Sequence, residues 1–180
     1  MRKMYLSAPL PFVGQKRMLA KEFMKVLEQY PDGTLFVDLF GGSGLLSHIT
    51  KSLKPHSTVI YNDFDNYRFR MKHIPQTNQL LADIREMVGN SVPRHKIIKG
   101  ELRERIFSRI EQEENSTGYV DFITLSSSIL FSMKYKLSVQ DMRKEALYNN
   151  IRKTGYPGMY GLSRRAGNRI LRLQGSIQPV

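Results

Sequence analysis

The stretch Thr34-Leu-Phe-Val-Asp-Leu-Phe-Gly-Gly-Ser-Gly44 is a short apolar run that ends in a glycine turn. An apolar run of this length bounded by glycine predicts a buried strand. The apolar residues of 45–53 follow at helical spacing, and 58–61 is a second run rich in β-forming residues. The stretch therefore predicts a strand, a helix and a second, parallel strand, joined by the right-handed crossover that such units almost always have.

The glycines Gly41, Gly42 and Gly44 follow the first predicted strand at its carboxyl end. There they let the backbone approach a ligand and direct the free N–H groups of the next helix toward it. Asp63, at the end of the second strand, is placed to accept hydrogen bonds from ribose hydroxyls. Asp38 would repel a pyrophosphate but attract an amine, which favours a nucleoside that carries an amino acid, such as S-adenosylmethionine. The alternative is an ordinary glycine turn between a strand and a helix.

The composition limits the class of protein. A chain of 180 residues can hold one domain, or a core with a small second lobe. The sequence has no cysteine, which excludes disulfides and thiolate metal sites and is compatible with a cytoplasmic protein. No apolar run approaches the length of a membrane span, and no hydrophobic signal core follows the first residues. We expect a soluble cytoplasmic protein without a metal centre.

The charge favours a polyanion as partner. The formal net charge is +12 and the pI is near 10.0. Residues 1–90 carry 12 Lys/Arg and 8 Asp/Glu, a net charge of +4, whereas residues 91–180 carry 16 and 8, a net charge of +8. This balance favours nucleic acid, ahead of a membrane surface because no long basic amphipathic helix is evident. The alternative is a basic surface whose charges do not share a face.

A short motif precedes the predicted strand unit. Phe12-Val-Gly-Gln-Lys16 lies between a proline-rich segment and a predicted helix whose apolar stripe spans 18–27. Taken alone, Phe12 reads as a core residue and Lys16 as a solvated charge. Together with the glycine turn and Asn62-Asp63, the motif resembles the cofactor half of Dam-type (D12 class) DNA adenine N6-methyltransferases. In that family an aromatic-x-Gly-Gly-Lys segment precedes an Asp-x-Phe-x-Gly-x-Gly turn and an Asn-Asp strand end.

This resemblance has two departures, at Gln15, where the family has a second glycine, and at Phe12, where tryptophan is common. It implies that Lys16 meets the methionine carboxylate of S-adenosylmethionine and that Phe12 packs on the cofactor. It also implies that the turn holds the methionine end and that an acid takes the ribose. The expected cofactor-binding residues are Phe12, Gly14, Lys16, Asp38, Phe40, Gly41, Gly42, Gly44 and Asp63.

The chain after the second strand is predicted to be helical and basic. Helices are expected over 77–87 and 101–114, the latter with a solvated charged face, whereas 122–130 suits a helix or a strand. Ser138 and Asp141 fit the capping box of a further helix. Basic, aromatic and amide residues interleave on both sides of that helix, a pattern suited to phosphate and base-edge contact. The candidate DNA-binding residues are Lys134, Lys136, Arg143, Lys144, Arg152 and Lys153.

The catalytic motif that the resemblance requires is missing. Such enzymes flip the target adenine and hold its N6 in an Asp-Pro-Pro-Tyr loop, but this sequence contains no Pro-Pro pair. The tail 158–180 is arginine-rich and shows no clear fold signal. Read one nucleotide out of frame, codons for 161–180 can encode an acidic strand like the one that precedes the catalytic loop in family members. We therefore hypothesise a change of frame near Pro157; the alternative is a genuine basic tail.

These observations predict an α/β fold, a partial Rossmann-like S-adenosylmethionine-dependent methyltransferase fold with a helical, basic recognition lobe. Residues 1–65 would form the cofactor-binding part, 66–157 the target-recognition region and 158–180 a basic tail. The resemblance implies a site-specific DNA adenine N6-methyltransferase acting on double-stranded DNA, inactive as these 180 residues and prone to self-association through an incomplete sheet. The alternatives are a non-catalytic DNA-binding protein that keeps a cofactor pocket, and an RNA methyltransferase on the same fold.

Overall fold

The computed structural model describes residues 4–14, 16–131, 134–157 and 170–173. The chain divides into two compact units. Unit 1 comprises residues 1–71 and 160–180, and unit 2 comprises residues 72–159. Unit 1 is therefore discontinuous in sequence, because the whole of unit 2 lies between its two segments. The change from one unit to the next falls after Met71, a few residues beyond the expected limit at 65.

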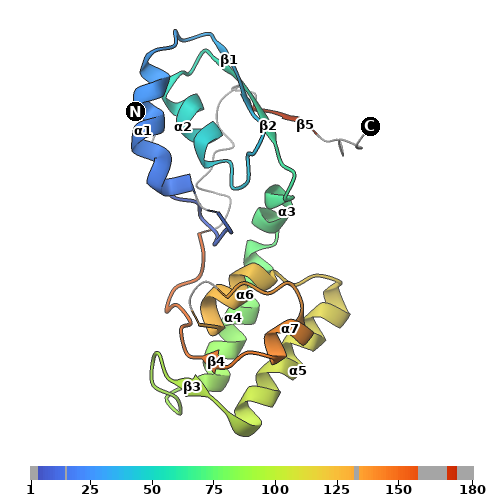
Figure 1. The fold of residues 1–180 in the computed structure, drawn as a ribbon. Coiled ribbons are helices and arrows are strands. Elements are labelled where there is room, and N and C mark those ends of the chain that lie inside the picture. Colours follow the sequence, from blue (N-terminus) through green and yellow to red (C-terminus); the bar gives the residue numbers. More distant parts are fainter. Residues whose placement is uncertain (1–3, 15, 132–133, 158–169, 174–180) are drawn as a thin grey trace. The chain divides into compact units, whose positions relative to one another are not determined.

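A three-stranded parallel sheet forms the centre of unit 1 (Figure 1). Its strands are β1 (Leu35–Asp38), β2 (Thr58–Asn62) and β5 (Ile170–Leu173), with β2 in the middle. Helix α2 (Leu45–Leu53) makes the crossover from β1 to β2. The predicted strand–helix–strand unit is confirmed, since β1 and β2 pair in parallel. The fold is a mixed α/β architecture.

The helices of unit 1 cover one face of the sheet. The short 3₁₀ helix η1 (Lys16–Leu19) leads into α1 (Ala20–Glu28), which packs with α2 through the buried side chains of Ala20, Leu27, Leu45 and Ile49. Alternation along β1 turns Phe36 toward this cluster and leaves Leu35 and Val37 exposed at 59% and 50%. The expectation of self-association through the sheet stays a prediction.

Unit 2 is mainly helical. Its helices are α4 (Ile74–Val88), α5 (Gly100–Thr117), α6 (Phe122–Ile129) and α7 (Val139–Arg143), and the two-residue strands β3 (Ile97–Ile98) and β4 (Leu147–Tyr148) pair antiparallel. Fully buried apolar side chains of these elements form its core, among them Ile84, Ile98, Ile106, Phe107, Ile110, Leu125 and Ile129. Unit 2 therefore has an interior of its own.

The helix boundaries follow from local chemistry. Helix α4 begins three residues before the predicted Thr77, because Pro75 is tolerated in the first turn, where its missing N–H would have no helical partner. The segment 122–130, left open by its sequence, is helical, and Asp121 caps it by accepting from the Thr124 amide at 3.1 Å. The predicted cap at Ser138 is confirmed, since its hydroxyl accepts from the Asp141 amide.

The tail, whose sequence shows no clear fold signal, contains a strand at 170–173. This Ile-Leu-Arg-Leu run is strand β5, with Ile170 opposite Val59 and Leu173 opposite Asn62. Residues 158–169 and 174–180 lie outside the described residues, and the hypothesis of a frame change is not tested. Within the described ranges, none of the helices has the length and apolarity needed to cross a bilayer.

Candidate functional site

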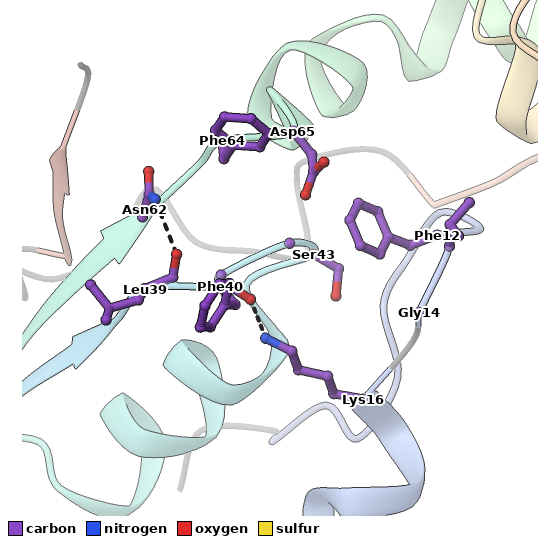
Figure 2. Close-up of a pocket in the computed structure, with 12 residues that line it drawn as sticks. Phe12, Gly14, Lys16, Leu39, Phe40, Ser43, Asn62, Phe64 and Asp65 are labelled. Atoms are coloured by element: carbon purple, nitrogen blue, oxygen red, sulfur yellow. Dashed lines mark hydrogen bonds between the residues drawn. The ribbon is translucent and has the colours of Figure 1, made fainter. Parts of the chain in front are cut away.

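A pocket of about 560 Å³ opens in unit 1 where β1 and β2 end (Figure 2). Six of the nine expected cofactor-binding residues line it: Phe12, Gly14, Lys16, Phe40, Gly41 and Gly42. Val13, Leu39, Ser43, Asn62, Phe64 and Asp65 complete the lining. Asp38, Gly44 and Asp63, the other three expected residues, do not line the pocket. The carboxyl ends of parallel strands are where open α/β sheets bind ligands.

The glycine turn brings backbone against two aromatic rings. A Cβ on Gly41 would lie 2.6 Å from the Asn62 carbonyl oxygen and closer still to the ring of Tyr61. A Cβ on Gly42, whose φ is +49°, would lie 2.8 Å from the ring of Phe12. Gly44 takes the cap position of α2 with φ +70°. The turn therefore has no room for a side chain at Gly41 or Gly42, where bare backbone lines the pocket.

The Tyr61 side chain holds the glycine turn by a hydrogen bond to its backbone. Its hydroxyl lies 2.6 Å from the Gly42 carbonyl oxygen and 3.1 Å from a carboxylate oxygen of Asp63. Burial, and then the negative charge of Asp63, raise the pKa of the Tyr61 hydroxyl. The hydroxyl thus stays protonated and able to donate at neutral pH.

Lys16, a cation of the pocket lining, is paired with a carboxylate that lies behind it. The Lys16 ammonium donates to the Phe40 carbonyl oxygen (Figure 2). It also lies 3.9 Å from a carboxylate oxygen of Asp38. Asp38 sits behind it, its side chain 14% exposed, and its other oxygen accepts from the Ser47 hydroxyl at 2.7 Å. The pocket lining therefore contains a cation, Lys16, with the carboxylate of Asp38 directly behind it.

Asp63 faces the following helix rather than the pocket. Its carboxylate is 7% exposed and accepts hydrogen bonds from the backbone amides of Tyr67, at 2.7 Å, and Arg68, at 3.2 Å. It thereby caps helix α3 (Tyr67–Lys72). The nearby acid that lines the pocket is Asp65, which is exposed. Sequence reasoning missed Asp65 and Phe64, although both directly follow the carboxyl end of β2, a position that signals the rim of a site.

Helix α3 in turn holds the segment that carries Phe12. The Tyr67 hydroxyl accepts from the Leu10 amide at 3.1 Å, and the Arg70 guanidinium donates to the Pro11 carbonyl oxygen at 2.9 Å. The rings of Phe12 and Tyr67 meet edge to face with centroids 5.5 Å apart. The acid that caps α3 is therefore linked through this helix to one wall of the pocket.

The basic residues expected at a DNA interface lie in unit 2, and several are paired with carboxylates. Lys134 and Lys136 both reach Glu145, at 2.6 and 2.9 Å, and their hydrogen bonds lower the pKa of that carboxyl. Lys144 lies 2.7 Å from Asp141. These three lysines are already partly neutralised by the protein itself.

Arg143, another of the candidate DNA-binding residues, makes more contacts within the protein than these three lysines do. Arg143 donates to Glu104 at 2.6 Å and to Glu111 at 2.9 Å, and its guanidinium lies 4.5 Å from the centroid of the Phe107 ring. Arg152 stacks over a tyrosine ring at 4.9 Å, whereas Lys153 is exposed and has no ion pair within the described ranges. In the part of the chain that the structure describes, no cluster of three His, Asp or Glu is placed to hold a metal ion.

Two comparisons with known proteins match this chain. The family model described as D12 class N6 adenine-specific DNA methyltransferase matches residues 12–166. A Haemophilus influenzae protein named "Putative methyltransferase" is 40% identical over 164 residues, which cover 89% of this chain and 54% of that protein. The chain thus spans about half the length of this curated relative. No solved structure gives a significant match. The residues matched by the family model include the glycine turn and the Lys16–Asp38 pair. The chain belongs to the D12 class of N6 adenine-specific DNA methyltransferases.

Proposed function

We propose that this chain binds S-adenosylmethionine in the pocket of unit 1 and serves an enzyme that methylates adenine N6 in double-stranded DNA. The observation that carries the proposal is the Lys16–Asp38 pair beside a glycine turn that has no room for a side chain at Gly41 or Gly42. The family membership supports methylation of DNA adenine in general. The parallel order of β1 and β2, with the pocket at their carboxyl ends, supports a Rossmann-like methyltransferase sheet.

The residues present suit the chemical groups of this cofactor. Lys16 would bind the methionine carboxylate and Asp38 its ammonium group, while the backbone of Gly41 would lie against the ligand. Phe12 forms one wall, and Phe64, 83% exposed at the rim, offers a ring face to a base. The cofactor supplies a reactive methyl group when bound; these residues bind and orient it.

Two acids are candidates for the ribose hydroxyls. Asp63 occupies the position that the family resemblance assigns, but its carboxylate also caps α3. Asp65 lies two residues on and lines the pocket. Both carboxylates follow the end of β2 and can accept hydrogen bonds. Replacing each acid separately and measuring the affinity for S-adenosylmethionine distinguishes their roles.

We also propose that these 180 residues alone do not transfer a methyl group. The family resemblance requires an Asp-Pro-Pro-Tyr loop to hold adenine N6, and the sequence has no Pro-Pro pair. An assay with labelled cofactor and unmethylated duplex DNA should therefore give no incorporation above background. Incorporation above background would contradict this part of the proposal, and labelling of RNA in place of DNA would favour the RNA methyltransferase alternative.

Calorimetric titration with S-adenosylmethionine tests the pocket. Replacing Lys16→Met removes a charge-assisted contact of about 1.5–3 kcal/mol, so the dissociation constant should rise roughly 13- to 160-fold. Lys21→Met is the matched control, because this exposed lysine of α1 has the same charge and does not line the pocket. Equal affinities for the wild type and Lys16→Met, or no binding to the wild type, would refute the proposal.

A further inference from the structure

Two segments of unit 2 contain cations and no acid. Residues 87–100 include Arg94, Lys96 and Lys99 without any Asp or Glu, and residues 146–157 include Arg152 and Lys153, again without either. All five side chains belong to exposed residues. Within the described ranges none of the five forms an ion pair, unlike Lys134, Lys136, Arg143 and Lys144. We call these five residues the β3–β4 basic surface.

The fold joins these two segments. Ile97 of β3 pairs with Tyr148 of β4, and Figure 1 shows the loop before β3 beside both strands. The pairing continues beyond the strands, because the His95 amide donates to the Asn149 carbonyl oxygen and the Asn149 amide donates to the Lys96 carbonyl oxygen, each at 2.9 Å. Cations that are about fifty residues apart in sequence are thereby brought to one local structure.

The loop that carries Arg94 is fixed before any ligand binds. His95 has a φ of +65°, and its ring nitrogen Nδ1 lies 2.8 Å from the Asn150 side-chain oxygen. The Asn149 side chain donates to the Val92 carbonyl oxygen at 2.7 Å. A preformed loop loses less conformational freedom on binding than a mobile one does. The cost of ordering the backbone of this loop is therefore already met by the fold.

The amides near these cations serve the protein itself. Asn150 uses its oxygen on His95 and donates from its nitrogen to the Leu130 carbonyl oxygen at 3.2 Å. Side chains occupied in this way are poor readers of base edges, which need both an acceptor and a donor of an amide. Unpaired cations without available amides suit the phosphate backbone, which carries no sequence information.

We propose that the β3–β4 basic surface binds the phosphate backbone of duplex DNA, and that the paired cluster at 134–144 does not provide the main contact. This inference rests on the proposed function, since DNA as substrate comes from there. It names where the DNA lies on unit 2 and what kind of contact is made: sequence-independent and dependent on salt.

The test measures the affinity for a labelled DNA duplex by fluorescence anisotropy between 50 and 200 mM salt, without S-adenosylmethionine. The triple variant Arg94→Gln/Lys96→Gln/Lys99→Gln is compared with Lys134→Gln/Lys136→Gln/Lys144→Gln. A third variant, Lys21→Gln/Lys72→Gln/Arg105→Gln, removes the same charge from exposed residues elsewhere. Circular dichroism melts show whether each variant is folded.

Each lost phosphate contact should lower the slope of log affinity against log salt by roughly 0.9, so the first triple should lose about 2.7 in slope. The advantage of the wild type over this variant should then shrink roughly 40-fold between 50 and 200 mM salt. The loss should be the same for duplexes of different sequence, and the other two triples should keep most of the wild-type slope.

Three results would overturn the inference. Equal losses in all three triples would show that net charge alone acts, and a larger loss in the 134/136/144 triple would place the contact there. Tighter binding of duplex RNA than of duplex DNA would assign the surface to another partner. The anisotropy assay contains no cofactor. If calorimetry detected no binding of S-adenosylmethionine, the proposed function would be refuted, but the DNA affinities could still be interpreted.

Discussion

Replacing Asp63→Ala removes the carboxylate that joins β2 to helix α3. Asp63 is 7% exposed. Its carboxylate is the acceptor for the backbone amides of Tyr67 and Arg68 and for the hydroxyl of Tyr61. Loss of a helix cap costs about 0.5–2 kcal/mol, and loss of a further hydrogen bond costs about 1 kcal/mol. We expect local opening of α3 to become easier by about 1.5–3 kcal/mol, which is a roughly 13- to 160-fold larger open population.

Amide hydrogen exchange at residues 67 and 68 measures this opening directly, without cofactor. Asp63→Asn keeps one acceptor oxygen and should recover part of the protection. Asp65→Ala is the control. It removes the same charge two residues further along the chain, and the exposed carboxylate of Asp65 has no hydrogen bond in the described part of the chain. Unchanged exchange in Asp63→Ala, or an equal change in Asp65→Ala, would refute the assignment of Asp63 as the cap.

The same variants separate the cap from a ribose contact. If Asp63 acts through α3, opening this helix releases Leu10 and Phe12 and lowers the fraction of protein that can bind S-adenosylmethionine. Tyr67→Phe, which removes the acceptor of the Leu10 amide but keeps the cap, should then weaken cofactor binding as well. If Tyr67→Phe binds normally and Asp63→Ala does not, the carboxylate meets the ligand itself.

Further predictions concern the turn, a half-buried histidine and an ion-pair network. Gly41→Ala should weaken S-adenosylmethionine binding at least about tenfold in calorimetry, because its Cβ would overlap the ring of Tyr61; normal affinity would contradict the packing described for the turn. Burial lowers the pKa of His48, whose Nε2 accepts from the Tyr5 amide. Since the folded pKa lies below the unfolded value near 6.5, the stabilisation by His48 is complete above about pH 6.5 and is lost as the pH falls through the folded pKa; an NMR titration midpoint at or above 6.5 would disprove this. Arg109→Met should lower the stability of unit 2 by about 2–4 kcal/mol in urea unfolding near pH 7, because it leaves one carboxylate on α4 and another on α5 without their cation. No loss of stability in Arg109→Met would contradict the role given to this arginine.

The sequence was informative where local rules decide the structure. The glycines at 41–44, and the apolar spacing of 45–53, predicted the turn and the limits of α2, because both depend on residues near in sequence. The cap at Ser138 was predictable for the same reason. In contrast, β3 and β4 are two residues each and exist only because Ile98 meets Leu147, a pairing that no local pattern shows.

The candidate site was predictable in its location but not in its details. Asp63 and Asp65 lie two residues apart, so spacing alone cannot tell which carboxylate turns toward α3 and which lines the pocket. Charge was equally ambiguous. Lys134 and Lys136 look like phosphate ligands until the fold brings Glu145 to both of them. A list of cations in sequence does not show which of them are already neutralised.

The position of unit 2 between β2 and β5 affects the order in which the chain can be completed during synthesis. The sheet partner of Val59 is Ile170, so one edge of β2 stays unpaired until residues 170–173 have been synthesised. An unpaired strand edge is a template for wrong pairing. Residues 72–159 are synthesised in that interval, and helical structures with local contacts fold quickly. An insertion that folds early as a compact unit shortens the free chain between the two strands, and so shortens the time for which the nascent sheet remains open.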